Sequence, residues 1–126
     1  MKFLLIMILL FSHALSDDDY KKEHSYSKDL SYLRLNSNQK YETKILLKKY
    51  RKDIKKYRKL KKKIEKEKER VFLSNKFYNN EIEDLNTDLS IKASRVENSF
   101  LENMYKILTP RQRMKFVKYI NEWEIE

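Results

Sequence analysis

Apolar side chains recur with a helical period along most of this chain. From residue 37 to residue 71 they return every seven positions, with others in between: Tyr50, Tyr57, Ile64 and Val71, then Leu47, Ile54 and Leu60. Neither proline nor glycine interrupts the stretch, and strong helix formers dominate it. The pattern predicts one long helix with an apolar seam of the coiled-coil type.

The rest of the chain continues the helical pattern after one predicted reversal. Turn-forming residues gather in SNKFYNN, residues 74–80. A second helix is predicted over about residues 81–106, and a short one after Pro110, with these apolar positions: Ile82, Leu85, Leu89, Val96, Phe100 and Met104, then Met114, Val117, Ile120 and Trp123. No stretch alternates with period two, so the predicted fold is all-α, a long helical hairpin with short flanking helices, about four in all.

The first residues do not fit this helical domain. Residues 1–16, MKFLLIMILLFSHALS, have one basic residue, an apolar run and small residues at the end. The apolar run is shorter than the roughly 20 residues that span a bilayer, so a cleaved signal peptide is predicted, with an uncleaved membrane anchor as the alternative. Residues 17–34 are polar and are predicted to form a flexible leader, with a short helix near its end. Residues 35–126 then form the helical domain.

Composition limits the function of an exported chain of this kind. The chain has 126 residues, a formal net charge of +10 and no cysteine, so no disulfide can stabilise it. An exported protein rarely meets nucleic acid, which leaves acidic or unfolded polypeptides and anionic envelope surfaces as partners for the positive charge. No nucleophile–base set or glycine-rich phosphate loop is present, so we expect neither catalysis nor a cofactor.

The single proline lies in a motif that occurs twice. In LTPRQRM, Thr109 is a natural N-cap, Pro110 suits the first helical position, and Gln112 completes a capping box. The stretch LNSNQKY, 73 residues earlier, repeats the arrangement with Asn36 as the cap and Gln39 three residues later. The full set of motif residues is Leu35, Asn36 and Gln39, then Leu108, Thr109, Pro110, Gln112 and Arg113.

This pair of motifs resembles the LTxxQ motif of the Spy/CpxP family of bacterial periplasmic proteins. The copy at residues 108–113 is the better match, whereas the first copy has Asn36 in place of threonine. The resemblance implies a periplasmic location and a thin, cradle-like antiparallel homodimer of helical hairpins. It also implies ATP-independent, chaperone-like binding of unfolded or acidic polypeptides, or damping of envelope-stress signalling. In that picture the motif residues are structural.

A dense run of positive charge follows the first motif. Lysines at spacings of three and four form a stripe opposite the predicted seam, and arginines flank it: Lys48, Lys52, Lys55, Lys59, Lys62 and Lys66, with Arg51 and Arg58. Like charges four residues apart on a helix repel one another, and an anionic partner would relieve that repulsion. The stripe is therefore a candidate client-binding surface, although a merely solvated helix face has the same pattern.

Two further questions stay open at the level of sequence. Tyr50, Ile54 and Tyr57 could supply apolar client contacts beside the stripe, or they could pack against the partner helix, which the seam pattern favours. A metal-sensing or metal-buffering role is known among relatives of the family. After signal removal His24 would be the only histidine left as a metal ligand, and the chain has no cysteine. Weak contact with an anionic envelope surface is a third possibility.

Overall fold

The computed structural model describes residues 30–125 of the chain. The predicted signal peptide, residues 1–16, and most of the predicted leader lie outside the described residues. At the end of the leader, the 3₁₀ helix η1 (Ser31–Leu33) is followed by Arg34 in the left-handed region, with φ of 50°. From Leu35 onward the chain forms a separate compact unit, and the following paragraphs describe that unit by itself.

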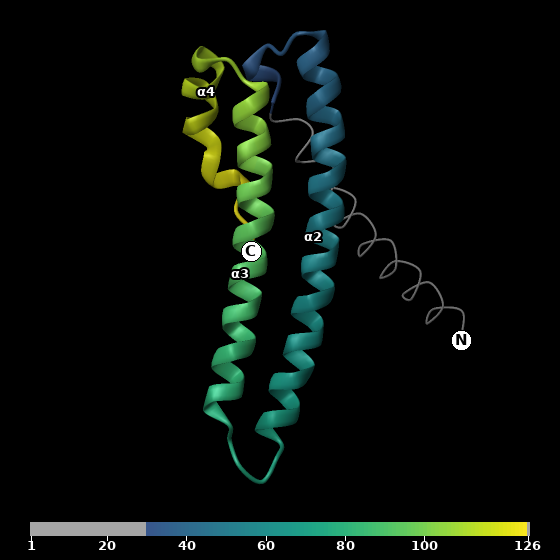
Figure 1. The fold of residues 1–126 in the computed structure, drawn as a ribbon, viewed down its shortest axis with the longest axis vertical. Helices are drawn as coiled ribbons and strands as arrows, with labels where there is room; N and C mark the ends of the chain where they lie inside the picture. The colour runs from purple at the N-terminus through teal and green to yellow at the C-terminus, as the bar shows by residue number, and fades with distance from the viewer. Residues whose placement is uncertain (1–29, 126) are drawn as a thin grey trace, which may run out of the picture. The chain divides into compact units, whose positions relative to one another are not determined.

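Two long antiparallel helices make up most of the unit (Figure 1). Helix α2 (Ser37–Phe72) and helix α3 (Asn79–Ile107) pack along their length, and the turn between them lies where the turn-forming residues predicted it. The short helix α4 (Pro110–Phe116) continues into the 3₁₀ helix η2 (Val117–Trp123), and this segment folds back beside α3. Residues 30–125 contain no strand, so the predicted all-α hairpin is confirmed.

The predicted seam is the interior of the hairpin. The α2 side chains at heptad spacing are all buried, as are three of the predicted α3 positions: Tyr50, Tyr57, Ile64 and Val71, then Val96, Phe100 and Met104. Burying each such side chain is worth about 1.5–3 kcal/mol, so the seam is the main source of the hairpin's stability. Because α3 covers this seam within one chain, the seam by itself gives no reason to expect a dimer.

An aromatic cluster closes the end of the hairpin at which η2 returns. The Trp123 ring lies 4.5 Å from the Phe100 ring and 6.0 Å from the Tyr50 ring, between ring centroids. The Tyr50 hydroxyl donates a 2.8 Å hydrogen bond to the Trp123 carbonyl oxygen. Farther along α3, Ile82, Leu85 and Leu89 are only half-buried, because α2 alone packs on that part. The core is therefore thickest at one end of the molecule.

The predicted apolar face of the last helix is wrong in two positions. Met114 and Val117 are 74% and 61% exposed, whereas Phe116 and Trp123 are buried. The prediction assumed a single α-helical period beyond Pro110. The chain instead changes to a 3₁₀ helix after seven α-helical residues, with about 3.0 rather than 3.6 residues per turn, so that one α-helical face cannot continue. The bulkiest aromatic side chains then occupy the interior.

Both predicted capping boxes are present, and they contact each other. Asn36 and Thr109 accept hydrogen bonds from the backbone N–H of Gln39 and Gln112, at 2.8 and 3.3 Å, and each glutamine accepts one from the backbone N–H of its own cap. The two glutamine side chains also bond reciprocally, at 2.8 and 3.2 Å. Gln39 Nε2 donates to the Ile107 carbonyl as well, at 2.9 Å. The starts of α2 and α4 are thereby joined to the end of α3.

The remaining motif residues support the same junction. Leu108 is buried, Leu35 is half-buried, and Pro110 occupies the first turn of α4. The Arg113 guanidinium lies 3.6 Å from the centroid of the Tyr105 ring, and its Nε donates to the Tyr105 carbonyl at 3.0 Å. The motif residues thus fix the direction of α4 and form no open site.

Candidate functional site

The outer face of α2, opposite the seam, is the candidate functional surface, and we call it the basic face. Every predicted client-binding cation is exposed there: Lys48, Arg51, Lys52, Lys55, Arg58, Lys59 and Lys62. Residues 48–66 contain twelve Lys or Arg residues and two acidic ones. At a rise of about 1.5 Å per residue, this stretch is about 27 Å long. Helix geometry thus converts a run of charge into an elongated cationic surface.

Few of these cations have an acidic partner. In residues 30–125, the only ion pair on the basic face joins Lys49 to Asp53, at 2.7 Å and one helical turn apart. Near the end of α2, Arg70 pairs with Glu67 at 3.0 Å and with Glu81 of α3 at 2.6 Å. The hydrogen bond and negative charge of Glu67, and then the charge of Glu81, raise the pKa of Arg70. The middle of the basic face keeps its charge uncompensated.

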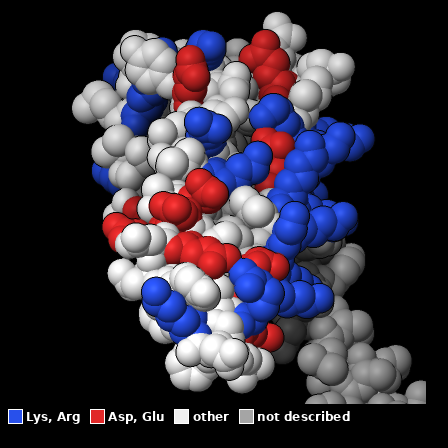
Figure 2. Space-filling view, turned by 60° about the horizontal axis from the view of Figure 1, so that its bottom comes forward, with Lys and Arg blue, Asp and Glu red and all other residues white. Residues whose placement is uncertain are grey.

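Acidic residues are concentrated on the first half of α3. Between Asn79 and Ile91 there are four acidic residues and no basic one. Figure 2, in which the closed end of the hairpin comes forward, shows Lys and Arg side chains along the side of α2 and acidic side chains beside them. The hairpin is thus polarised across its width, with a basic outer face on one helix and an acidic surface on the other.

The structure decides where the three apolar client-binding candidates lie. Tyr50, Ile54 and Tyr57 are buried, at 2%, 7% and 6% exposure, and Tyr50 packs against Phe100 with ring centroids 4.5 Å apart. The other interpretation, that these three side chains pack against the partner helix, is therefore correct. Their suggested place as exposed contacts beside the stripe was wrong, because α2 directs this side of its surface toward α3.

Apolar side chains are exposed instead at the two ends of α2. Tyr41 and Ile45 lie two turns and one turn before Lys48, respectively, on the basic face. At the other end, four apolar side chains surround the turn between the helices: Phe72, Leu73, Phe77 and Tyr78. Sequence reasoning assigned residues 74–80 only to a turn. The signal it missed was the number of large apolar residues in FLSNKFY.

The described residues show no other organised site. A shallow, open depression on α3, between Asn79 and Ile91, is lined by polar side chains together with Ile82 and Ile91. No group of three or more His, Cys, Asp or Glu side chains in residues 30–125 is placed to hold a metal ion, and His24 lies outside the described residues. Over the same residues no helix has both the length and the apolar character needed to cross a membrane.

Comparisons with protein-family models, with curated proteins and with solved structures found no match to this chain. The resemblance to the Spy/CpxP family therefore stays a prediction from the two motifs. The geometry adds that these motifs form one hydrogen-bonded unit at the thick end of the hairpin, away from the basic residues in the middle of α2.

Proposed function

We propose that the protein is an exported, periplasmic and ATP-independent binding protein that captures acidic or unfolded polypeptides on the basic face of α2. The observation that carries the proposal is the row of exposed cations between Lys48 and Lys66, most of them without an acidic partner among the described residues. Two features support it: the resemblance to the Spy/CpxP family, and the exposed Tyr41 and Ile45 at the start of the same face.

The dimensions of the basic face indicate what it can hold. A polypeptide in extended conformation advances about 3.3–3.6 Å per residue, so about eight residues would cover the 27 Å of the face. Acidic side chains along such a segment would meet lysines at every helical turn, and apolar side chains at one end would reach Tyr41 and Ile45. Long-range attraction would then speed capture, and apolar contact would slow release.

The test compares two charge-matched variants in an aggregation assay with an acidic model client. One variant replaces Lys55, Lys59 and Lys62 on the basic face by glutamine. The control replaces three exposed lysines elsewhere by glutamine: Lys106, Lys115 and Lys118. We expect the parent and the control to suppress aggregation at low salt, and the basic-face variant to lose most of that protection.

Two results would refute the proposal. The first is that the parent gives no protection at low salt with an equimolar amount of client. The second is that both triple variants lose protection equally, since net charge rather than the basic face would then be responsible. High salt should weaken protection by the parent, because exposed charges are screened beyond about 8–10 Å at physiological ionic strength.

We also propose that the protein acts as an antiparallel homodimer. The support is the family resemblance and the half-buried Ile82, Leu85 and Leu89 on the first half of α3, where contact with another copy would leave the basic face of α2 open to polypeptides. Sedimentation equilibrium of the purified protein should give twice the chain mass, and a monomer at all concentrations would exclude this assembly.

A further inference from the structure

Apolar and cationic side chains meet on the outer side of the segment that α4 and η2 form. Met114 and Val117 are 74% and 61% exposed, and they lie three residues apart, so they are neighbours on the helix surface. Arg111 lies about one turn before Met114, and Lys118 about one turn after it. Both cations are exposed, as is Lys115 beside them. We call these five residues the α4 surface.

The α4 surface lies in a part of the chain with net positive charge. Between residues 103 and 121 there are five Lys or Arg residues and no Asp or Glu. Glu102 and Glu122 flank this stretch, and Glu102 pairs with Lys106 at 3.5 Å. If the count is extended to the neighbouring part of α3 and to the end of the described chain, residues 95–125, six cations stand against four acidic residues. An anionic partner is therefore complementary to this surface.

Contacts on the inner side hold the segment in place. Phe116 and Trp123 are buried, and their ring centroids lie 6.5 Å apart. The Arg113 guanidinium lies over the Tyr105 ring, and its Nε donates to the Tyr105 carbonyl oxygen at 3.0 Å. The exposed apolar and cationic side chains are thus presented by an ordered scaffold.

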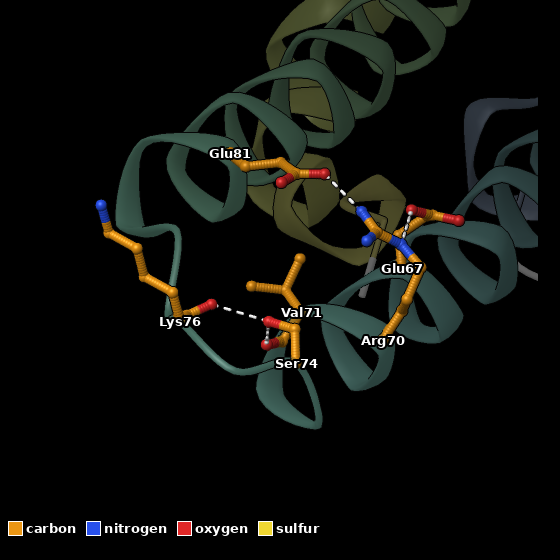
Figure 3. Close-up of polar contacts among 6 residues, drawn as sticks. All are labelled: Glu67, Arg70, Val71, Ser74, Lys76 and Glu81. Atoms are coloured by element: carbon orange, nitrogen blue, oxygen red, sulfur yellow. Dashed lines mark hydrogen bonds and ion pairs between the residues drawn. The ribbon is translucent and has the colours of Figure 1, made fainter.

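Two other exposed surfaces lack this combination. The turn between α2 and α3 exposes apolar side chains, but acids and cations are mixed around it, and Arg70 pairs with Glu67 and Glu81 (Figure 3). In the middle of the basic face, residues 48–66, no exposed apolar side chain lies among the cations. On α4, exposed apolar side chains and net positive charge occur together within eight residues, 111–118.

The form of the α4 surface favours a flat partner. It is the outer side of a helix, and the depression found on the described residues lies elsewhere, on α3 between Asn79 and Ile91. A second copy that docked through the same surface would bring the cations of both chains together, and their repulsion opposes such a contact. A bilayer surface needs no groove. Lys and Arg side chains can extend to its headgroups while apolar neighbours enter the interface.

From this arrangement we propose that the α4 surface binds an anionic lipid bilayer, with Met114 and Val117 in the interface and the three cations at lipid phosphates. The stretch from Arg111 to Lys118 is only about 10 Å long, so one flat patch of headgroups meets all five residues. Because only two apolar side chains enter, binding should be reversible and should depend on anionic lipid.

This inference is separate from polypeptide capture. In Figure 1, α4 lies beside α3 on the side away from α2, whereas the basic face is the side of α2 opposite α3. The two cationic surfaces therefore point in different directions. A protein bound to a bilayer through α4 would keep its basic face accessible to polypeptides.

The first test is sedimentation with vesicles of phosphatidylcholine, alone or mixed with phosphatidylglycerol. The protein is purified after export, and its intact mass is measured so that all variants share one N-terminus. At about fivefold per cation near an anionic surface, R111Q/K115Q/K118Q should bind the mixed vesicles about a hundredfold more weakly than the parent. The charge-matched control K55Q/K59Q/K62Q should keep most of the binding. Equal losses in both variants, or a parent that does not bind, would overturn the proposal.

The second test removes the apolar contribution. M114S/V117S should bind the mixed vesicles about tenfold or more weakly, because the interface no longer buries the two side chains. The control F72S/L73S removes side chains that are still more exposed, at the turn between the long helices, and should bind like the parent. Circular dichroism should show both variants folded, since all four side chains are exposed. Parent-like binding by M114S/V117S would contradict the proposal.

A fluorescent label shows directly whether the α4 surface enters the interface. The chain has no cysteine, so M114C provides one attachment site on α4 and N86C provides an exposed control site on α3. Emission from a polarity-sensitive dye should shift to shorter wavelength with mixed vesicles at position 114 only. An equal shift at both positions, or no shift at position 114, would count against insertion of α4 and overturn the inference.

Other occupants of the α4 surface give different results. If a second copy covers it, the parent will self-associate without lipid and M114S/V117S will not. If acidic polypeptides cover it, R111Q/K115Q/K118Q will lose aggregation suppression, and the parent will not bind vesicles. Either result overturns the lipid proposal. Aggregation suppression that all α4 variants retain, without vesicle binding by the parent, would reject this inference alone and leave polypeptide capture intact.

Discussion

Replacement of Gln39 by alanine should destabilise the protein more than the loss of an ordinary helix cap. The Gln39 side chain accepts hydrogen bonds from Asn36 N and Gln112 Nε2, and donates to Gln112 Oε1 and the Ile107 carbonyl. It is 8% exposed, so water replaces these bonds poorly. At about 0.5–1.5 kcal/mol net per hydrogen bond, the four together predict a loss of about 2–6 kcal/mol in the free energy of unfolding.

Mutual bonding between the two glutamines predicts a further result. Two of the four hydrogen bonds join Gln39 to Gln112, so each single substitution removes both of them. The double variant Q39A/Q112A should therefore lose about 1–2 kcal/mol less than the sum of the single variants. Asn38→Ala, an exposed substitution in the same turn of α2, should change stability by less than about 0.5 kcal/mol.

The assay is urea unfolding followed by circular dichroism at the helical band. A loss below about 1 kcal/mol for Q39A would show that water satisfies the Asn36 and Ile107 groups once the side chain is removed. Strictly additive single and double variants would show that the two glutamines do not interact in solution. Either outcome would refute the idea that the two motifs form one structural unit.

Three further predictions concern the core and the charge. Tyr50→Phe should lower the free energy of unfolding by about 1–1.5 kcal/mol, because the buried Trp123 carbonyl loses its donor; an unchanged urea midpoint would contradict this. Trp123→Ala should lower the free energy of unfolding by about 3–5 kcal/mol, because it removes the Trp123 ring from the aromatic cluster. A loss below 1 kcal/mol would mean that η2 does not pack on the hairpin. Added salt should raise the urea midpoint, because repulsion of about 0.2–0.5 kcal/mol per like-charged pair on α2 is screened; a fall would refute net repulsion.

The long helices could be predicted from the sequence because a period of seven over five turns or more leaves little ambiguity. Tyr50, Tyr57, Ile64 and Val71 are all buried as their spacing required. The last helix was harder to predict, because residues 110–123 are too few for periodicity to show which face is buried. Met114 and Phe116 are both apolar and two residues apart, and only the contact of Phe116 with Trp123 selects between them.

The capping boxes were predictable because they depend on residues three apart in sequence. The bond between Gln39 and Gln112 was not, because it joins residues 73 apart and depends on how α2 and α4 approach each other. The exposed apolar side chains around the turn between α2 and α3 were missed for a related reason. Turn-forming residues indicate where a chain reverses, whereas the exposure of Phe72 and Leu73 depends on what covers the turn, and periodicity carries no such information.

The position of the apolar groups on α2 leads to a last prediction about polypeptide capture. Because α3 covers Tyr50, Ile54 and Tyr57, the middle of the basic face offers only charge, and Tyr41 and Ile45 offer the apolar contacts at its start. Charge and apolar surface are thus separated along the helix. Replacing cations should then alter mainly the salt dependence of binding, whereas Y41S/I45S should remove the binding that persists at high salt.

Fluorescence anisotropy with a labelled acidic peptide that carries two leucines at one end would measure both effects. Near 1 M salt the Debye length is about 3 Å, so the attraction of the basic face should be almost fully screened and only the apolar contribution should remain. The triple glutamine variant at Lys55, Lys59 and Lys62 should match the parent there and differ at low salt. If Y41S/I45S instead binds like the parent at high salt, the residual affinity must come from another surface, and the assignment of these two residues to the capture face fails.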